Sequence, residues 1–324
     1  MSSGIAGFGT RGVVSPRVSC SNAPQPEFPA PPSLPMREHK PIDAAALLIV
    51  GCVRNGARTV RRAVETLKRA SHGFARVQFL IIESDSTDGT VAELQRLRNE
   101  VTGFQFTSLG ALAEQIPART ERIAACRNRY LDELRHDSQY AQVDYVMVAD
   151  LDGVNDALRP EAVATCWAST QPWDVVAANQ SDAYYDIWAL RHPDWCPVDC
   201  HEQYSRLREM FDRPRALAIA IHSRMARLSP RAAWIEVDSA FGGLAIYRRE
   251  ALLSGRYSGG NPERPVCEHV PLHAELRAQG YRIFINPALI NAHRTDHSAR
   301  IGLRVRLRRE IEAAGKRLRE RLRG

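Results

Sequence analysis

The sequence contains no long hydrophobic run. The longest, residues 44–53, includes a glycine and is far shorter than the roughly 18 apolar residues that suggest a membrane span, so it indicates a buried strand. Residues 1–40 hold no basic stretch followed by an apolar one, which argues against a secretory leader. The seven cysteines are odd in number and irregular in spacing, which favours free thiols in a reducing compartment. We therefore expect a cytoplasmic protein.

Most of the chain carries no excess of positive charge. The formal net charge is +7, and residues 300–323 alone hold ten basic and three acidic residues, so the remainder is neutral. A nucleic-acid-binding surface is therefore not expected. Within residues 299–324, apolar side chains recur at helical spacing, at Leu307, Ile311, Ala314, Leu318 and Leu322. This basic amphipathic tail helix either lies on an anionic membrane surface, at the inner membrane face, or packs its apolar stripe on the domain.

Strands and helices are predicted to alternate after an N-terminal arm. Residues 1–40 are rich in proline, serine and glycine, and we predict that they are disordered. Beyond them, the pattern predicts strands at 47–53, 77–82, 104–109 and 145–149, and helices at 59–70, 91–97 and 119–136. This order predicts one large α/β domain with a mainly parallel central sheet and helices on both faces.

Polar loops follow three of the predicted strands, at residues 51–56, 83–90 and 150–153. Ligands of parallel sheets bind beyond the carboxyl ends of the strands, so we expect these loops to form one site. The second loop is also explained as a turn and helix cap. In the third, Asp150 and Asp152 are separated by one residue, and two such carboxylates can share a hard divalent cation that also holds a diphosphate.

Several segments, in this order, resemble the nucleotide-sugar domain of GT-A glycosyltransferases, especially those of family 2. They are residues 47–55, the turn 81–90, Ala125-Cys126-Arg127-Asn128 and Asp150-Leu151-Asp152. Downstream, residues 241–252 look like the Gly-Gly strand of that family, and Glu268-His269 looks like the start of its catalytic helix. Residues 184–191, 241–243 and 267–270 are also similar to CAP59-type capsule-associated α-mannosyltransferases.

The resemblance implies a GT-A fold and a hexosyltransferase. Its implied reaction moves a sugar from a GDP- or UDP-sugar to a glycan or lipid-linked acceptor, in polysaccharide or glycoconjugate assembly. Residues 41–153 would form the nucleotide-sugar-binding half, and residues 154–298 the acceptor-binding and catalytic half. A Mn²⁺ or Mg²⁺ ion would be bound by Asp152 directly, by Asp150 through water or beside the ribose, and by His293 after the apolar run 281–290.

The resemblance also implies the residues that bind the donor. Arg127 would contact the diphosphate or ribose, Glu83 and Asp85 would accept hydrogen bonds from the base or ribose, and Arg54 would assist them. The second turn has Glu83-Ser84 where the family has an acidic pair. The identity of the base is therefore left open.

Catalysis is assigned to Glu268 or His269, which replace the acidic pair expected on the catalytic helix. If the enzyme inverts, one of them would act as general base behind the acceptor. If it retains, as the narrower resemblance implies, the leaving phosphate would collect the proton. The sequence leaves both mechanisms open.

The acceptor is expected beside the aromatic-rich segment between residues 173 and 234. Tyr185 and Trp188 are predicted to form a platform for the acceptor, with Asp182 and Asp186 as polar partners. These aromatic residues are equally consistent with ordinary core packing. Cys196, Cys200 and His201 lack a second ligand pair, so reduced thiols are favoured over structural zinc.

Two other functions are compatible with this architecture. A sugar nucleotidylyltransferase would need a glycine-rich, basic loop after the first strand, and residues 51–56 are a poor version of that loop. A non-catalytic glycan-binding protein could retain the fold, but the presence of both acidic metal positions argues against it.

Overall fold

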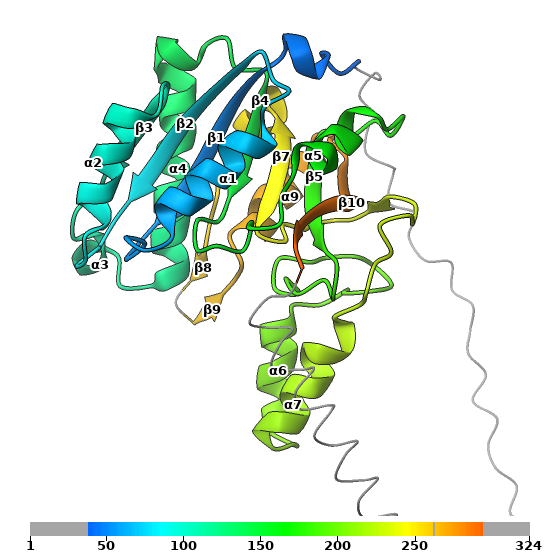
Figure 1. Ribbon diagram of the computed structural model, residues 1–324. Coiled ribbons are helices and arrows are strands. Elements are labelled where there is room, and N and C mark those ends of the chain that lie inside the picture. Colours follow the sequence, from blue (N-terminus) through cyan, green and yellow to red (C-terminus); the bar gives the residue numbers. More distant parts are fainter. Residues whose placement is uncertain (1–37, 262, 294–324) are drawn as a thin grey trace, which may run out of the picture. The chain divides into compact units, whose positions relative to one another are not determined.

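The computed structural model describes residues 38–261 and 263–293. The predicted basic tail helix and residues 1–37 of the predicted arm lie outside this range. The described chain forms an eight-stranded sheet with the order β3-β2-β1-β4-β7-β5-β10-β6 (Figure 1). A separate two-stranded sheet joins β8 (Gly260–Asn261) to β9 (Arg264–Pro265).

Four parallel strands form the first half of the sheet. They are β1 (Ala46–Val53), β2 (Arg76–Glu83), β3 (Phe104–Ser108) and β4 (Tyr145–Ala149). The intervening helices are α1 (Val60–Ala70), α2 (Thr90–Glu100), the short α3 (Leu112–Gln115) and α4 (Arg119–His136). The bounds of α4 and β4 are those predicted, and the other predicted elements differ only at their ends.

The second half of the sheet mixes strand directions. Its strands are β5 (Val175–Gln180), β6 (Ile235–Glu236), β7 (Leu244–Arg248) and β10 (Ile283–Ala292). β7 runs antiparallel between β4 and β5, β10 is parallel to β5, and β6 is antiparallel to β10. Four of the seven pairings are therefore parallel, which confirms the predicted α/β fold with a mainly parallel sheet.

Alternate side chains of the strands enter two hydrophobic cores, because successive residues of a strand point to opposite faces. Leu48 and Val50 of β1 belong to the core beneath α4, α8 (Arg249–Leu253) and α9 (His269–Ala278). Leu47 and Ile49 belong to the core beneath α1, α2 and α5 (Pro160–Trp167). Both faces are thus covered by helices, as predicted, and the strand ends remain available for a ligand.

The segment between β5 and β7 carries two further helices that lie side by side, α6 (Cys200–Arg208) and α7 (Arg213–Ala220) (Figure 1). The side chains of Asp199 and Asp212 cap their N-termini. Three short 3₁₀ turns complete the described chain, at Ile42–Ala44, Ser138–Tyr140 and His222–Arg224.

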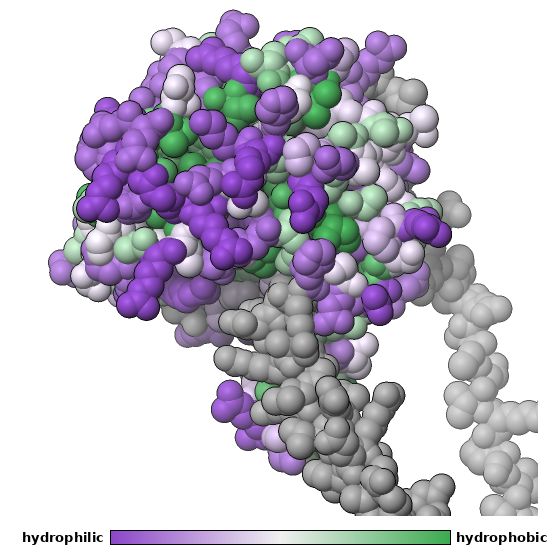
Figure 2. Space-filling model, in the orientation of Figure 1, coloured by the Kyte–Doolittle hydropathy of each residue, from purple (hydrophilic) through white to green (hydrophobic). Residues whose placement is uncertain are grey.

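Residues 38–40, which were predicted to end the arm, contact the folded domain. The His39 ring stacks on Trp173 with 4.2 Å between centroids, and the Lys40 backbone N–H donates to the Tyr145 hydroxyl at 3.0 Å. On the face shown in Figure 2, hydrophilic side chains cover most of the surface, with smaller hydrophobic areas between them. Within the described residues, no helix has the length and apolar character needed to cross a membrane.

Candidate active site

A cavity of about 540 Å³ lies where the loops after β1, β2 and β4 approach α4 and the start of α9. It brings together most of the predicted site residues, namely Arg54, Asp85, Arg127, Asp150, Asp152, Tyr185, Asp186, Trp188, Glu268 and His269. Glu83, Asp182 and His293 do not line it. Residues of all three polar loops therefore line one cavity at the carboxyl edge of the sheet.

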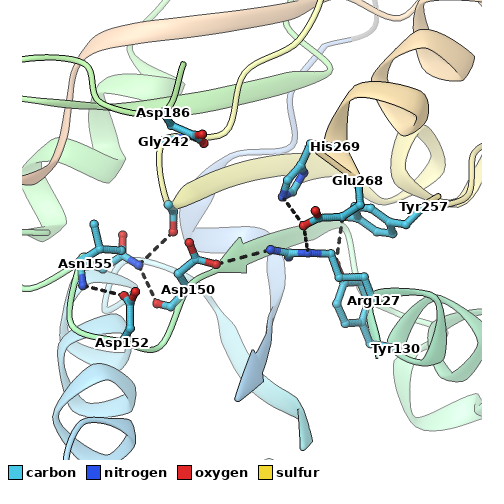
Figure 3. Close-up of polar contacts among 12 residues, drawn as sticks. Arg127, Tyr130, Asp150, Asp152, Asn155, Asp186, Gly242, Tyr257, Glu268 and His269 are labelled. Carbon is cyan, nitrogen blue, oxygen red and sulfur yellow. Dashed lines mark hydrogen bonds and ion pairs between the residues drawn. The ribbon is translucent and has the colours of Figure 1, made fainter. Parts of the chain in front are cut away.

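Asp150 and Asp152 lie on the loop that follows β4 (Figure 3). The Asp150 backbone N–H donates to the Gly243 carbonyl at 2.9 Å, and Asp152 Oδ1 accepts the Val154 N–H at 3.1 Å. Asp152 is exposed, and 38% of the Asp150 side chain is accessible from the cavity. Both carboxylates can therefore meet a ligand.

A buried amide network fixes this loop against the glycine turn before β7. Asn155 Nδ2 donates to the carbonyls of Asp150 (2.8 Å) and Gly243 (3.0 Å), and Asn291 Nδ2 donates to Asn155 Oδ1 (2.8 Å). Gly243 has a φ of 81°, and a Cβ there would lie 2.7 Å from Val154 Cγ1. Glycine is therefore required at this position. Neither Asn155 nor Asn291 was predicted, since an isolated asparagine carries no signal of a distant partner.

Arg127 bridges the two acidic walls of the cavity (Figure 3). Its Nε donates to Glu268 Oε1 at 2.8 Å, and its Nη2 lies 3.4 Å from Asp150 Oδ1. The guanidinium also lies over the rings of Phe241 and Tyr257, at 5.1 and 5.6 Å from their centroids. Arg127 is only 4% exposed, and its Nη1 is buried without a hydrogen-bond acceptor. The side chain is therefore held in place while one donor nitrogen remains unpaired.

The carboxylates around Asp150 create a local excess of negative charge. The pKa of Asp150 is raised to about 7, chiefly because surrounding protein atoms desolvate the carboxyl group despite its partial access to the cavity. Arg127 opposes this shift, while Asp152, Asp186 and Glu268 reinforce it. A bound cation would relieve this repulsion, so the donor chemistry fits a hard divalent ion.

The predicted third metal ligand is not part of this arrangement. His293 is exposed, and its Nδ1 lies 3.1 Å from Ser181 Oγ, outside the cavity lining. No group of three histidine, cysteine, aspartate or glutamate side chains is poised to hold a metal in residues 38–261 and 263–293. The ligand set that the structure offers is therefore the two aspartates. Such sites are usually completed by water and substrate phosphate oxygens.

Glu268 and His269 lie at the start of α9, and Glu268 is its N-cap residue. The Glu268 carboxylate is buried and faces Arg127. Burial lowers the pKa of His269 well below its ordinary value, and Arg127 and His273 contribute to that shift, so the ring is neutral at pH 7. His269 Nδ1 lies 3.4 Å from the Tyr247 hydroxyl, while its buried Nε2 has no hydrogen-bond partner.

The side of the cavity predicted to bind the nucleotide contains fewer carboxylates and more arginines than expected. Glu83 is buried, and its two oxygens accept from the Ser86 N–H and the Ser108 hydroxyl, so it supports the turn from within. Asp85 adopts a positive φ of 58° and accepts the Ala113 N–H at 2.7 Å. Arg119 and Arg122 join Arg54 in the lining. Arg119 and Arg122 precede Arg127 on α4 by eight and five residues, so helical spacing does not group them with it, and neither was predicted from the sequence.

The predicted acceptor residues are only partly brought together. Tyr185 and Trp188 line the cavity, as does Asp186, whose Oδ2 accepts the Gly242 N–H at 3.0 Å. Asp182 is exposed outside the lining. Other aromatic residues of the segment, including Trp173 and Tyr184, are fully buried core residues. The core interpretation therefore holds for those two, and the predicted acceptor platform is limited to Tyr185 and Trp188.

No protein-family model matches the chain, and no curated protein matches it. Similar solved structures include a mannosyltransferase from Pyrobaculum calidifontis in complex with GDP-Man and Mn²⁺, at 17% identity and a TM-score of 0.44. S. aureus TarS in complex with UDP-GlcNAc is 11% identical, also with a TM-score of 0.44. Each alignment covers 78% of this chain and 60% of that chain.

Mannosyl-3-phosphoglycerate synthase from Rubrobacter xylanophilus is 16% identical, with a TM-score of 0.40. That alignment covers 86% of this chain and 76% of the synthase. This chain thus spans about 60% of the length of the mannosyltransferase and of TarS. At these identities and TM-scores the similarities carry no conclusion about activity.

Proposed function

We propose that this chain is a metal-dependent glycosyltransferase that moves a hexose from a GDP- or UDP-sugar to a glycan or lipid-linked acceptor. The observation that carries the proposal is that Asp150, Asp152 and Arg127 line one cavity at the carboxyl edge of the sheet, with Arg127 Nη2 3.4 Å from Asp150 Oδ1. A sugar diphosphonucleotide needs its diphosphate charge neutralised when the glycosidic bond breaks. Two carboxylates for a cation and a fixed guanidinium provide complementary positions for that task.

Asp150 and Asp152 would hold Mn²⁺ or Mg²⁺, and a cation bound there neutralises charge on the departing diphosphate. Arg127 would supply a fixed positive charge beside the diphosphate of the nucleotide-sugar, and its buried Nη1 has no hydrogen-bond acceptor within the described residues. Its contacts with Glu268 and Asp150 keep the guanidinium oriented before the donor arrives. Arg54, Arg119 and Arg122 would add positive charge on the nucleotide side of the cavity.

Glu268 is the candidate general base if the reaction inverts. It is the N-cap residue of α9, the predicted catalytic helix. Arg127 donates to its Oε1, which leaves Oε2 to take the proton from the acceptor hydroxyl. The neutral His269 lies beside it, with 3.8 Å between Nε2 and Glu268 Oε1, which is beyond hydrogen-bond distance, so the orientation of that carboxylate depends on Arg127. If the reaction retains, Glu268 would instead position the acceptor together with Tyr185 and Trp188.

The test is hydrolysis and transfer with a panel of GDP- and UDP-sugars, with Mn²⁺, with Mg²⁺ and with chelator. Asp152→Asn should abolish turnover, whereas Asp156→Asn should retain it. Asp156 is a matched control because it lies on the same loop but forms a surface ion pair with Arg62, at 2.7 Å. Binding of a nucleotide-sugar without turnover, unchanged by Asp152→Asn, would favour a glycan-binding protein. Sugar-1-phosphate-dependent synthesis of the nucleotide-sugar would favour a nucleotidylyltransferase.

A further inference from the structure

A buried row of hydrogen bonds, the histidine network, ends at His269 in the wall of the cavity. It begins at Ser239, whose Oγ lies 2.9 Å from His273 Nδ1. His273 Nε2 lies 2.8 Å from the Tyr247 hydroxyl, and that hydroxyl lies 3.4 Å from His269 Nδ1. All four residues are buried, with at most 1% of each exposed. The network therefore joins β7, which carries Tyr247, to α9, which carries both histidines.

The two rings are neutral, so the directions of their hydrogen bonds are linked. Burial lowers the pKa of His273 to about 3 and that of His269 well below its ordinary value. Each ring thus carries a single N–H at pH 7, and the Tyr247 hydroxyl has a single proton, which it donates to one ring while it accepts from the other. Either every proton is donated toward His269, or every proton is donated toward Ser239.

Both ends of the histidine network favour donation toward His269. At one end, the Ser239 hydroxyl is buried, and donating to His273 Nδ1 gives its proton the acceptor that a buried donor needs. At the other end, His269 Nε2 lies 3.8 Å from Glu268 Oε1, and a carboxylate at that distance favours an N–H over a nitrogen lone pair. In this direction Tyr247 donates to His269 Nδ1, which leaves the proton of that ring on Nε2.

Stacking holds the His269 ring in this orientation. The ring lies on Phe241, with 3.9 Å between ring centroids and 20° between the planes, and Tyr257 meets it edge-on at 5.5 Å. His269 lines the cavity, and its buried Nε2 has no hydrogen-bond partner among the described residues. The separation of 3.8 Å from Glu268 Oε1 is too long for a hydrogen bond, so the N–H is available to a ligand.

We propose that Ser239, His273 and Tyr247 are positioning residues that hold His269 as its Nε2–H tautomer, so that His269 donates a hydrogen bond to a hydroxyl group of the sugar substrate. This role rests on the proposed function. An N–H beside a carboxylate matches a hydroxyl, because a hydroxyl accepts one hydrogen bond while it donates another. A nitrogen that already carries a proton cannot remove one from the acceptor, so His269 is a donor, and the role of base in an inverting reaction is left to Glu268.

The tautomer is measured by ¹⁵N NMR of the full chain labelled at its histidine rings, because protonated and bare ring nitrogens resonate far apart. His269→Ala and His273→Gln assign the two signals. Both rings are expected to carry their proton on Nε2. In Tyr247→Phe, His269 Nδ1 loses its donor, so His269 should become a mixture of both tautomers.

Tyr140→Phe is the matched control, because Tyr140 is equally buried and its hydroxyl has no hydrogen-bond partner among the described residues. It should leave both rings unchanged. A proton on Nδ1 of His269 in the wild type would overturn the proposal, as would an unchanged His269 tautomer in Tyr247→Phe. If Tyr247→Phe does not fold, Ser239→Ala makes the same test from the other end of the network.

Transfer kinetics test the donor role separately. Loss of one hydrogen bond to the sugar should lower kcat/KM about 2–10-fold in His269→Ala. Tyr247→Phe should lower it within the same range and should have no further effect in the His269→Ala background, because Tyr247 acts through His269. Independent effects that multiply would overturn the positioning role. A wild-type chain that transfers no sugar counts against the proposed function, whereas the NMR spectrum still decides the tautomer.

Discussion

The ion pair between Arg127 and Glu268 makes a quantitative prediction about stability. The two side chains are 5% and 8% exposed, and their closest atoms are 2.8 Å apart. Replacing one partner leaves an uncompensated charge in a water-poor site, which typically costs about 3–5 kcal/mol. Arg127→Met should therefore lower the free energy of unfolding by that amount. Arg129→Met, on the same helix, should cost less than about 1 kcal/mol, because Arg129 is 49% exposed in its pair with Glu133.

A double-mutant cycle isolates the pair from the rest of the arginine's contacts. Arg127→Met combined with Glu268→Gln removes both charges, so the double variant should be more stable than the sum of the two single changes by at least about 1 kcal/mol. The free energies of unfolding are measured by urea denaturation, and the comparison requires that the variants share one m value, the dependence of that free energy on urea concentration. The reasoning is refuted if Arg127→Met costs no more than Arg129→Met, or if the two single effects simply add.

Three further predictions concern the glycine turn before β7, the stability of the chain at acidic pH and the basic C-terminal tail. Gly243→Ala should destabilise the chain by about 2 kcal/mol or more, because the φ of Gly243 is 81° and a Cβ there would lie 2.7 Å from Val154 Cγ1. Urea unfolding measures this change. An unchanged unfolding midpoint would contradict the assigned turn. Burial lowers the pKa of His273 to about 3 from 6.5, so below pH 6.5 the unfolded state binds a proton that the folded state does not. Stability should therefore fall as pH drops from 6.5 toward 3. At pH 5 His273 lowers the free energy of unfolding by about 2 kcal/mol. The variant His273→Gln should remove this loss. The control variant His72→Gln, at an exposed position, should not change it. Deleting residues 300–324 should weaken sedimentation with anionic vesicles more than turnover on a soluble acceptor, and equal sedimentation of both forms would remove the membrane role.

Local patterns were sufficient to predict most of the elements. The helix at 119–136 and the strand at 145–149 have the predicted bounds, because each follows from the periodicity of its own apolar residues. The position of Asp150 and Asp152 also follows from a local rule, since any loop after a parallel strand reaches the carboxyl edge of the sheet. These features need no knowledge of distant contacts.

The direction in which some side chains turn was not predictable, because it depends on contacts between distant residues. Glu83 follows a predicted strand, like Asp150, yet it turns inward because Ser86 and Ser108 supply donors for its carboxylate. His293 follows the last strand as expected, but its ring lies beside Ser181 and outside the cavity lining. Periodicity places a residue at the end of a strand and does not say which way its side chain turns.

The amino-acid sequence by itself determined the alternation of strands and helices, the two acidic positions after β4 and the neutral charge of the chain outside its basic tail, since each depends on neighbouring residues alone. Only the tertiary structure decided that β7 enters antiparallel between β4 and β5, and that Arg127 meets Glu268 across 141 positions of sequence. Such pairings depend on how the helices pack over both faces of the sheet, and that packing is a property of the whole domain, not of any short segment.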